Sequence, residues 1–398
     1  MPNTEIADLI ADRSNGRLEK RFRHGTHRAD DPAHLLAAIS DDLPTYGITR
    51  VARVTGLDRI GIEVYMISRP NGRGLSVTQG KGYTRDAARL SGIMEAVESW
   101  HAERPTLPLR FASRSEMALD TELPKGLAQL GVTQDDMPLL WAMAIDLGTG
   151  GEVAVPFDAV HSCFLGQARL KGSTFRVSTN GLASGANPAE AVVHALCELI
   201  ERHATNCLCD FAPTDRNHRS LDLDSVDDPD ARALLSRFEE AGIGVTVWDA
   251  ADDIDVPSYV ACISDLRDPT TPPGFGAGCH PSRAVALNRA LCEAAQSRLT
   301  RISGVRDDLT PRAYGPLERA QARYLARLGD PAEGVAPRPF QAAPDIATNC
   351  LARDLWRIVD ALAEAGFSQA LVLSLSQDTR YSVVRAIVPG LRGLEFDR

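Results

Sequence analysis

The sequence predicts a mixed α+β fold in which helices and strands alternate without regular spacing. Three observations favour this class. Long stretches with apolar residues on a 3.6-residue period indicate amphipathic helices, and shorter runs rich in β-branched residues indicate strands. The 398 residues are 44% hydrophobic and 24% charged, which is typical of a globular chain with a sizeable core. The irregular order of the elements matches neither a Rossmann sheet nor a β/α barrel.

The chain divides into an N-terminal segment, 1–50, expected to pack on a main domain that spans 51–398. The segment is charged and irregular, apart from a short helical stretch near DPAHLLAAIS at 31–40. Strands follow at VARVTGL (51–57) and IEVYMISRP (62–70), where β-branched residues are frequent.

Five helices are expected in the main domain, several of them after an Asp-Pro or Asn-Pro pair that is typical of a helix start. They span 85–103, 188–209, 227–241, 280–302 and 349–365. Further strands are expected at 245–248, 258–264, 370–375 and 382–388. Two segments rich in Asp, Pro and Arg are interpreted as surface connections or short helices, and they span 211–230 and 303–349.

Charge and composition exclude several classes of partner. The formal net charge of −10 argues against a nucleic-acid surface, because binding to phosphate backbones depends on clustered Lys and Arg. No stretch reaches the roughly 18 apolar residues of a membrane helix, and the polar start lacks the apolar core of a signal peptide. We therefore expect a cytoplasmic protein that binds neither nucleic acid nor a membrane.

The eight cysteines are scattered, and most lie in apolar runs such as HALCELI and RALCEAA. Reduced core cysteines are therefore expected. Cys207 and Cys209 form the one close pair, and this C-x-C has no matching second pair, which argues against a structural zinc site. The alternative that one of the cysteines is an exposed, reactive thiol stays open.

Three long segments repeat one pattern, which is the most informative feature of the sequence. They are GKGYTRDAARLSGIMEAVES, SGANPAEAVVHALCELIER and GCHPSRAVALNRALCEAAQSR. In each, a glycine-containing loop leads into a helix with an Ala, a Glu seven residues later, and Glu or Gln three residues after that. The sets are Ala88, Glu95 and Glu98; Ala191, Glu198 and Glu201; and Ala286, Glu293 and Gln296.

This spacing places each set on one face of a helix. The face is otherwise apolar, as in AVVHALCELI, and an ionised Glu there costs several kcal/mol unless it meets a partner or a metal. The acidic groups of the three helices are therefore expected to converge. Two simpler interpretations stay open. The acidic residues could lie on solvated helix faces, or the repeat could be a structural duplication without any chemical role.

Convergent carboxylates repel one another unless cations neutralise them. Hard oxygen ligands suit Mg²⁺, which commonly binds together with the phosphates of a substrate. The glycine loops are expected to bind the anion through exposed backbone N–H groups and through the charge of Lys81. The glycines proposed for this role are Gly80, Gly82, Gly181 and Gly185. Neither G-x-x-x-x-G-K-[ST] nor the kinase signature set is present.

The three segments resemble the signature regions of the YcaO family, and the similarity runs from about residue 20 to the final IVPGLRG. The resemblance implies a YcaO-type fold with repeated loop–helix units around a site for ATP and Mg²⁺. It also implies ATP-driven phosphorylation of a peptide amide oxygen, which opens the amide carbon to a nucleophile. The products of such reactions are azolines, amidines or thioamides.

The resemblance also assigns roles to individual residues. Magnesium would be held by Glu95, Glu98, Glu198 and Glu201. The nucleotide and its phosphates would be contacted by Arg28, Lys81, Ser91, Glu190, Arg202 and Glu293. Gln296 and Arg298, in the motif E-x-x-Q-x-R, are the candidates for catalytic roles beside the nucleotide. Of these, Arg28 lies in RHGTHR, where the match to the family is loose.

Several of these residues have a plainer alternative role. Arg202 and Arg298 could equally form structural salt bridges, and Ser91 could pack within its helix. His194 and His203 are expected to be packing or surface histidines.

Two departures from the family pattern bear on the reaction. The family usually carries Asn directly after the Gly of the second loop, where this sequence has Ala186 followed by Asn187. The proline-rich C-terminus of azoline-forming members is missing, and the motifs are closer to members that work beside a TfuA protein in thioamide formation. We therefore expect thioamide formation. The alternatives are an azoline-forming cyclodehydratase, a metal-dependent hydrolase and a non-catalytic peptide-binding scaffold.

The expected partners are a peptide or protein substrate and a TfuA-like or other recruitment protein. The reason is that the 398 residues contain no fused leader-binding or ubiquitin-activating-like domain. Assembly as a homodimer stays open.

Overall fold

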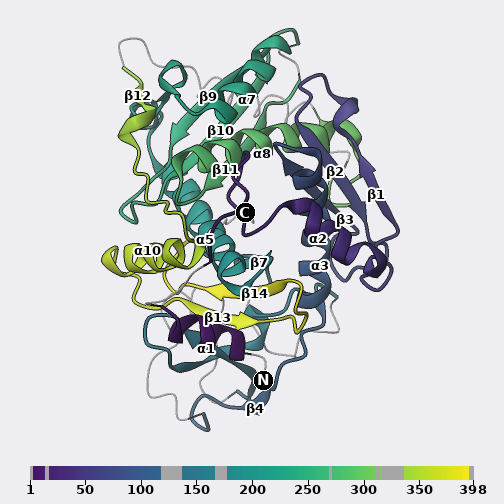
Figure 1. The fold of residues 1–398 in the computed structure, drawn as a ribbon, viewed down its shortest axis with the longest axis vertical. Helices are drawn as coiled ribbons and strands as arrows, with labels where there is room; N and C mark the ends of the chain where they lie inside the picture. Colours follow the sequence, from purple (N-terminus) through teal and green to yellow (C-terminus); the bar gives the residue numbers. More distant parts are fainter. Residues whose placement is uncertain are drawn as a thin grey trace.

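The computed structural model describes residues 3–13, 18–117, 137–165, 177–268, 271–310, 314–315 and 336–393. Helices and antiparallel sheets alternate along the chain (Figure 1), so the predicted mixed class is confirmed. None of the described helices is both long and apolar enough to cross a membrane. Part of the predicted connection at 303–349 lies outside the described residues.

Three antiparallel sheets organise the molecule. The first has the order β1 (Arg50–Arg53), β2 (Glu63–Ser68), β3 (Val77–Gly82). The second has the order β11 (Gly274–Cys279), β10 (Ser258–Asp265), β9 (Ile243–Asp249). The third has the order β4 (Arg110–Ala112), β5 (Leu139–Asp146), β13 (Leu371–Ser374), β14 (Ser382–Ile387), β7 (Leu182–Gly185), with β6 (Glu152–Pro156) beside β5. A short parallel pair joins β8 (Leu221–Asp222) to β12 (Arg338–Pro339).

One long helix from each sequence repeat covers each of the three sheets. Helix α3 (Arg85–Glu103) packs on β2 and β3, α5 (Pro188–Asp210) on β7 and β14, and α8 (Arg283–Ser303) on β10 and β11. The three helices surround the middle of the molecule (Figure 1). Thr84 and Asn187 cap α3 and α5, because their side chains accept the N–H groups of Ala87 and Glu190.

Most of the expected glycine loops before these helices are strands instead: Gly80 and Gly82 lie in β3 and Gly185 in β7, while Gly181 precedes β7 in a turn. Glycine is required there since the strand and helix backbones nearly touch. A Cβ atom on Gly80 would lie 2.1 Å from the carbonyl oxygen of Ala88, and one on Gly185 would lie 2.4 Å from the nitrogen of Ala191. Gly80 and Gly185 therefore allow close packing of strand against helix, while the anion-binding role of the glycines stays a prediction.

Five shorter helices are also present among the described residues. They are α1 (Thr4–Ala11), α2 (Pro32–Ile39), α6 (Pro213–Asn217), α7 (Pro229–Glu240) and α10 (Leu351–Glu364). All five predicted main-domain helices are present, with ends within three residues of those expected. Helix α1 was not predicted, although its Ile6 is fully buried. In the predicted strand 51–57, only the first part is a strand, and Thr55–Leu57 form a 3₁₀ turn.

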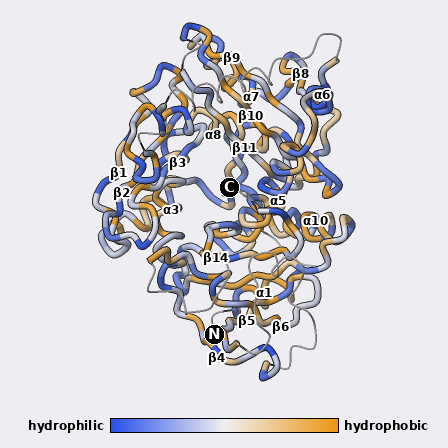
Figure 2. The backbone as a smooth tube through the Cα atoms, turned by 180° about the vertical axis from the view of Figure 1, so that it is seen from behind, coloured by the Kyte–Doolittle hydropathy of each residue, from blue (hydrophilic) through white to orange (hydrophobic). Residues whose placement is uncertain are grey.

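The hydrophobic core has three main parts, one beneath each repeat helix. One lies around α3 and β5, one between α5, α10 and the strands β13 and β14, and one between α7, α8, β9 and β10. Apolar stretches of the chain lie along β5 and β14 (Figure 2). The eight cysteines form no disulfide; six are buried, Cys207 is half-buried and Cys209 is exposed. The boundary between 1–50 and 51–398 stays a prediction.

Candidate active site

A cavity of about 1130 Å³ lies between α3, α5 and α8. It exceeds the roughly 300–1,000 Å³ typical of small-molecule sites, so it has room for a nucleotide and part of a second substrate. Of the twelve predicted site residues, eleven line it: Arg28, Lys81, Ser91, Glu95, Glu98, Glu190, Glu198, Glu201, Arg202, Glu293 and Gln296. The predicted convergence of the three acidic faces is therefore what the fold produces, while the individual roles stay predictions.

Burial dominates the electrostatics of the glutamate cluster. Desolvation raises the pKa of Glu95 to about 7, of Glu98 to about 8 and of Glu201 to about 7, and the nearby carboxylate of Glu198 adds to each shift. Glu95 has exposed surface, but this surface faces the cavity, with protein around it. Polar groups orient two of them: the Ser184 hydroxyl donates to Glu98 at 2.6 Å, and the Cys279 N–H donates to Glu201 at 3.0 Å.

Cations of the protein neutralise only part of the cluster. Lys81 pairs with Glu293; burial alone would lower the pKa of Lys81 and raise that of Glu293, but their attraction outweighs burial and shifts both pKa values the other way. Arg202 donates to Glu198 at 2.9 Å. In the part of the chain that the structure describes, no Lys or Arg lies within ion-pair distance of Glu95, Glu98 or Glu201.

The donor set therefore fits Mg²⁺. Carboxylate oxygens are hard ligands, and three of them lack a protein cation although they lie together in a cavity. A divalent ion would supply the missing charge and favour the ionised form of each carboxyl group.

Arg28 and Glu190 join the N-terminal segment to the cavity wall. Arg28 Nη1 donates to Glu190 Oε1 at 2.9 Å, and the Ala29 N–H donates to Glu190 Oε2 at 2.8 Å. The side chain of Asn187 caps α5, because its Oδ1 accepts the backbone N–H of Glu190. The departure from the family pattern is thus a helix cap, while Ala186 lines the cavity.

Arg298 is the predicted site residue that the structure places elsewhere. Its guanidinium donates to Asp58 at 2.9 Å and to Asp265 at 3.0 Å, and the residue is 7% exposed and outside the cavity lining. The structure therefore does not bring Arg298 to the cavity, and its contacts are the structural salt bridges that the sequence left open as an alternative.

Among the cavity residues that were not predicted as site candidates, His194 and Arg289 share a position in the repeat. Both lie four residues before the first glutamate of their set, as Ser91 does on α3. This shared register could have identified them. Burial, with help from Arg289, holds the pKa of His194 well below its usual range, so the ring is neutral at neutral pH, and its Nδ1 has no hydrogen-bond partner among the described residues. His194 was expected to be a packing or surface residue.

The raised carboxyl pKa values predict a pH-dependent response to magnesium. Stability from a carboxyl group with a raised folded pKa is complete below its unfolded pKa, about 4.3, and is lost as pH rises through the folded value, here about 7 to 8. Mg²⁺ should restore this loss, because it binds the ionised form. We expect Mg²⁺ to raise the Tm more at about pH 8.5 than at about pH 6, measured against EDTA. Equal shifts at both pH values would contradict the assignment.

Comparisons with known proteins agree with this geometry. Residues 79–392 match the family model described as YcaO cyclodehydratase, ATP- and Mg²⁺-binding. An uncharacterised protein encoded in the tfuA 3′ region of Rhizobium leguminosarum bv. trifolii is 36% identical over 376 residues, which cover 92% of this chain and 88% of the relative. An uncharacterised protein of Methanothermobacter thermautotrophicus is 34% identical over 375 residues, covering 92% and 95%.

Solved structures share the fold. YcaO from Methanopyrus kandleri, bound with AMPPCP and Mg²⁺, is 25% identical with a TM-score of 0.73 and 94% of each chain covered. A heterocyclase in complex with substrate and cofactor is 18% identical with a TM-score of 0.77, and the match covers 98% of this chain and 56% of the heterocyclase chain. The expected ATP and Mg²⁺ are the ligands that the family model describes. The chain belongs to the YcaO family.

Proposed function

We propose that this protein uses ATP and Mg²⁺ to activate a backbone amide of a peptide for chemical modification. The observation that carries the proposal is the cluster of glutamates that protein cations only partly neutralise, at the wall of a cavity large enough for a nucleotide. The AMPPCP and Mg²⁺ bound by the Methanopyrus relative support it.

Within this proposal, Glu95, Glu98, Glu198 and Glu201 hold Mg²⁺, which neutralises charge on the phosphates. The chain's own cations stand around the same carboxylates. Arg289 lowers the pKa of Glu293 and opposes the raised pKa of Glu201, and Arg202 pairs with Glu198. These groups orient the phosphates and stabilise charge that develops on the transferred phosphoryl group.

The reaction we propose is formation of a thioamide. The amide oxygen of the peptide bonds to the γ-phosphorus of ATP, the bond from that phosphorus to the bridging oxygen breaks, and ADP leaves. A sulfide nucleophile then bonds to the amide carbon, and phosphate departs with the former carbonyl oxygen. The relative encoded in the tfuA 3′ region supports a TfuA-like partner that recruits the peptide or delivers sulfur.

The product of this reaction distinguishes the alternatives by mass. With ATP, Mg²⁺, a TfuA-like protein, a candidate peptide and sulfide, we expect a gain of about 16 Da for exchange of oxygen by sulfur and release of ADP. Azoline closure would instead remove water, a loss of about 18 Da, and would replace the thioamide proposal by cyclodehydration. Peptide cleavage without ATP consumption would indicate a hydrolase, and peptide binding without either reaction a scaffold.

A further inference from the structure

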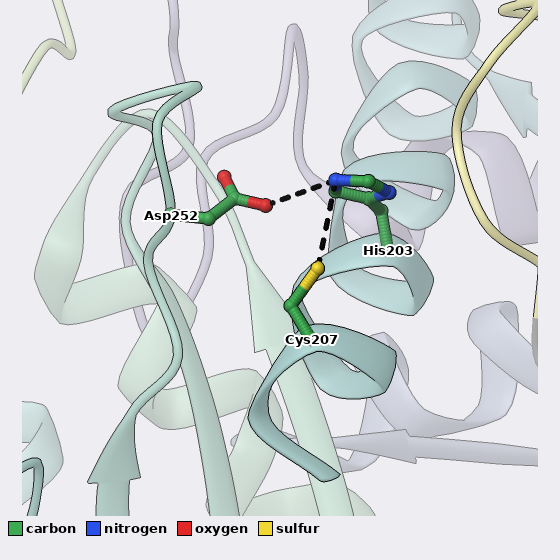
Figure 3. Close-up of side chains that lie close together, drawn as sticks. All are labelled: His203, Cys207 and Asp252. Atoms are coloured by element: carbon green, nitrogen blue, oxygen red, sulfur yellow. Dashed lines mark hydrogen bonds and ion pairs between the residues drawn. The ribbon is translucent and has the colours of Figure 1, made fainter. Parts of the chain in front are cut away.

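Three metal-ligating side chains meet on a face of α5 that does not line the cavity. They are His203 and Cys207, one helical turn apart, and Asp252, from the segment after β9 (Figure 3). The His203 Nε2 atom lies 3.2 Å from Asp252 Oδ2 and 3.7 Å from Cys207 Sγ. One ligand atom from each residue lies within 4.8 Å of the others, and none of the three residues lines the glutamate cavity.

The arrangement differs from that of a nucleophilic triad. In a triad the nucleophile and the acid contact opposite nitrogens of the histidine ring. Here the sulfur and the carboxylate both approach the same nitrogen, Nε2 (Figure 3). The three ligand atoms therefore surround one point, as they do around a metal ion.

The spacing of the ligand atoms suits zinc. Tetrahedral Zn²⁺ with ordinary bond lengths places nitrogen and sulfur ligands about 3.6 Å apart, and nitrogen and oxygen ligands about 3.4 Å apart. The observed 3.7 Å and 3.2 Å lie close to these values. Thiolate and imidazole ligands also favour Zn²⁺ over Mg²⁺, which prefers oxygen.

A second observation points to a missing ligand at this place. Asp252 Oδ2 is a buried atom that accepts no hydrogen bond from the described residues, while Oδ1 of the same group accepts the N–H of Ile254 at 3.1 Å. The His203 Nε2 atom lies 3.2 Å from this oxygen but makes no hydrogen bond with it, and a cation bound between the two atoms would satisfy the carboxylate.

We propose that His203, Cys207 and Asp252 form a Zn²⁺ site with one open coordination position, separate from the Mg²⁺ site. Zinc here would tie the C-terminal part of α5 to the segment that joins β9 and β10. Cys209, the other member of the C-x-C pair, is exposed and is not a ligand. Only Cys207 of the C-x-C pair belongs to the site, and the other two ligands are the histidine four residues before it and an aspartate distant in sequence.

Zinc binding would also displace the end of the chain. His203 Nδ1 accepts the backbone N–H of Arg392 at 2.9 Å, so Nε2 carries the proton of the neutral ring. A metal at Nε2 moves this proton to Nδ1, which can then no longer accept that N–H. The C-terminal segment held by His203, and by Asn206 through the Gly393 carbonyl, must shift when zinc binds.

The test is zinc titration of the full chain in excess Mg²⁺, with Co²⁺ as a spectroscopic probe. We expect one Zn²⁺ per chain and a thiolate-to-cobalt charge-transfer band in the wild type and in Cys209→Ser. Cys207→Ser should lose the band, and both Cys207→Ser and Asp252→Asn should bind Zn²⁺ at least about tenfold more weakly. Cys207→Ser is nearly isosteric, and far-ultraviolet circular dichroism checks its fold. Zinc affinity unchanged in both ligand variants, or lost in Cys209→Ser, would overturn the site.

Hydrogen exchange of the C-terminal peptide tests the coupling. Zinc should speed exchange of the Arg392 amide in the wild type and leave it unchanged in Cys207→Ser. Exchange that stays equally slow in zinc-loaded wild-type protein would overturn the proposed displacement. Neither measurement uses ATP or a peptide substrate, so failure here is distinguishable from failure of the proposed function.

Discussion

Replacing Glu201 by Gln is expected to abolish ATP-dependent peptide modification while the protein stays folded. Glu201 lies in the cavity without an ion-pair partner among the described residues, and burial raises its pKa to about 7. The amide keeps the size of the side chain and can still accept the N–H of Cys279, but it cannot supply negative charge to Mg²⁺. We expect turnover to fall at least about a hundredfold, as when one group that stabilises a charged transition state is removed. Glu98→Gln should behave in the same way.

The fold of these variants provides a sharp control. Because both carboxyl groups are buried beside other carboxylates, their removal should leave the Tm without Mg²⁺ unchanged or raise it. Glu239→Gln, an exposed position on α7, is the matched change away from the cavity and should keep wild-type turnover. Near wild-type turnover in Glu201→Gln would show that this carboxylate is not a magnesium ligand.

The helices and the convergence of their acidic faces could be predicted from the sequence because the signal is local. Glutamates at positions where a helix should be apolar are costly unless they meet something, and the register repeats on three helices. The strands β3, β7 and β11 could not be predicted in the same way. Their sequences, such as VTQGKG and GFGAGC, have low strand propensity. Glycine appears there because a helix backbone packs against the strand, and a single sequence does not record this contact.

The two motif arginines show what a motif match leaves out. Arg202 lies four residues after Glu198, about 40° around the helix, and it lines the cavity with that glutamate. Arg298 lies five residues after Glu293, about 140° around the helix, and it points to another partner set. Helix geometry could therefore have separated the two. The identity of the partners, Asp58 and Asp265, could not be foreseen, because they are distant in sequence.

His203, Cys207 and Asp252 were hidden for the same reason. The helical pair is visible as an i, i+4 spacing, but other potential ligands share this spacing, such as Asp30 with His34 and Cys350 with Asp354. The histidine was also expected to have a packing or surface role. The aspartate that completes the set follows a strand of another sheet. Only the packing of α5 against the segment after β9 brings the three together.

Replacing Arg298 by Met should destabilise the fold strongly and leave nucleotide binding by the folded protein nearly unchanged. The side chains of Arg298, Asp58 and Asp265 are 8%, 4% and 3% exposed. Asp265 keeps a second cation, Arg59 at 2.7 Å, but no second Lys or Arg pairs with Asp58 among the described residues. Loss of one partner from a buried ion pair leaves an uncompensated charge, and we expect a loss of about 3–5 kcal/mol in the free energy of unfolding.

Arg202→Met is the matched comparison, because Arg202 is a half-exposed cavity arginine paired with Glu198 at 2.9 Å. Its pair is more solvated, so its removal should cost less stability, whereas loss of a cation at the cavity wall should weaken Mg²⁺-nucleotide binding. Denaturant unfolding and calorimetric nucleotide titration of both variants separate the two roles. If Arg298→Met unfolded like the wild type and bound nucleotide as weakly as Arg202→Met, Arg298 would have to be assigned to phosphate binding. From the geometry we expect the reverse: Arg298→Met should lose stability and Arg202→Met should lose nucleotide affinity. Arg202 lines the cavity, whereas Arg298 holds α8 to β10 through Asp265.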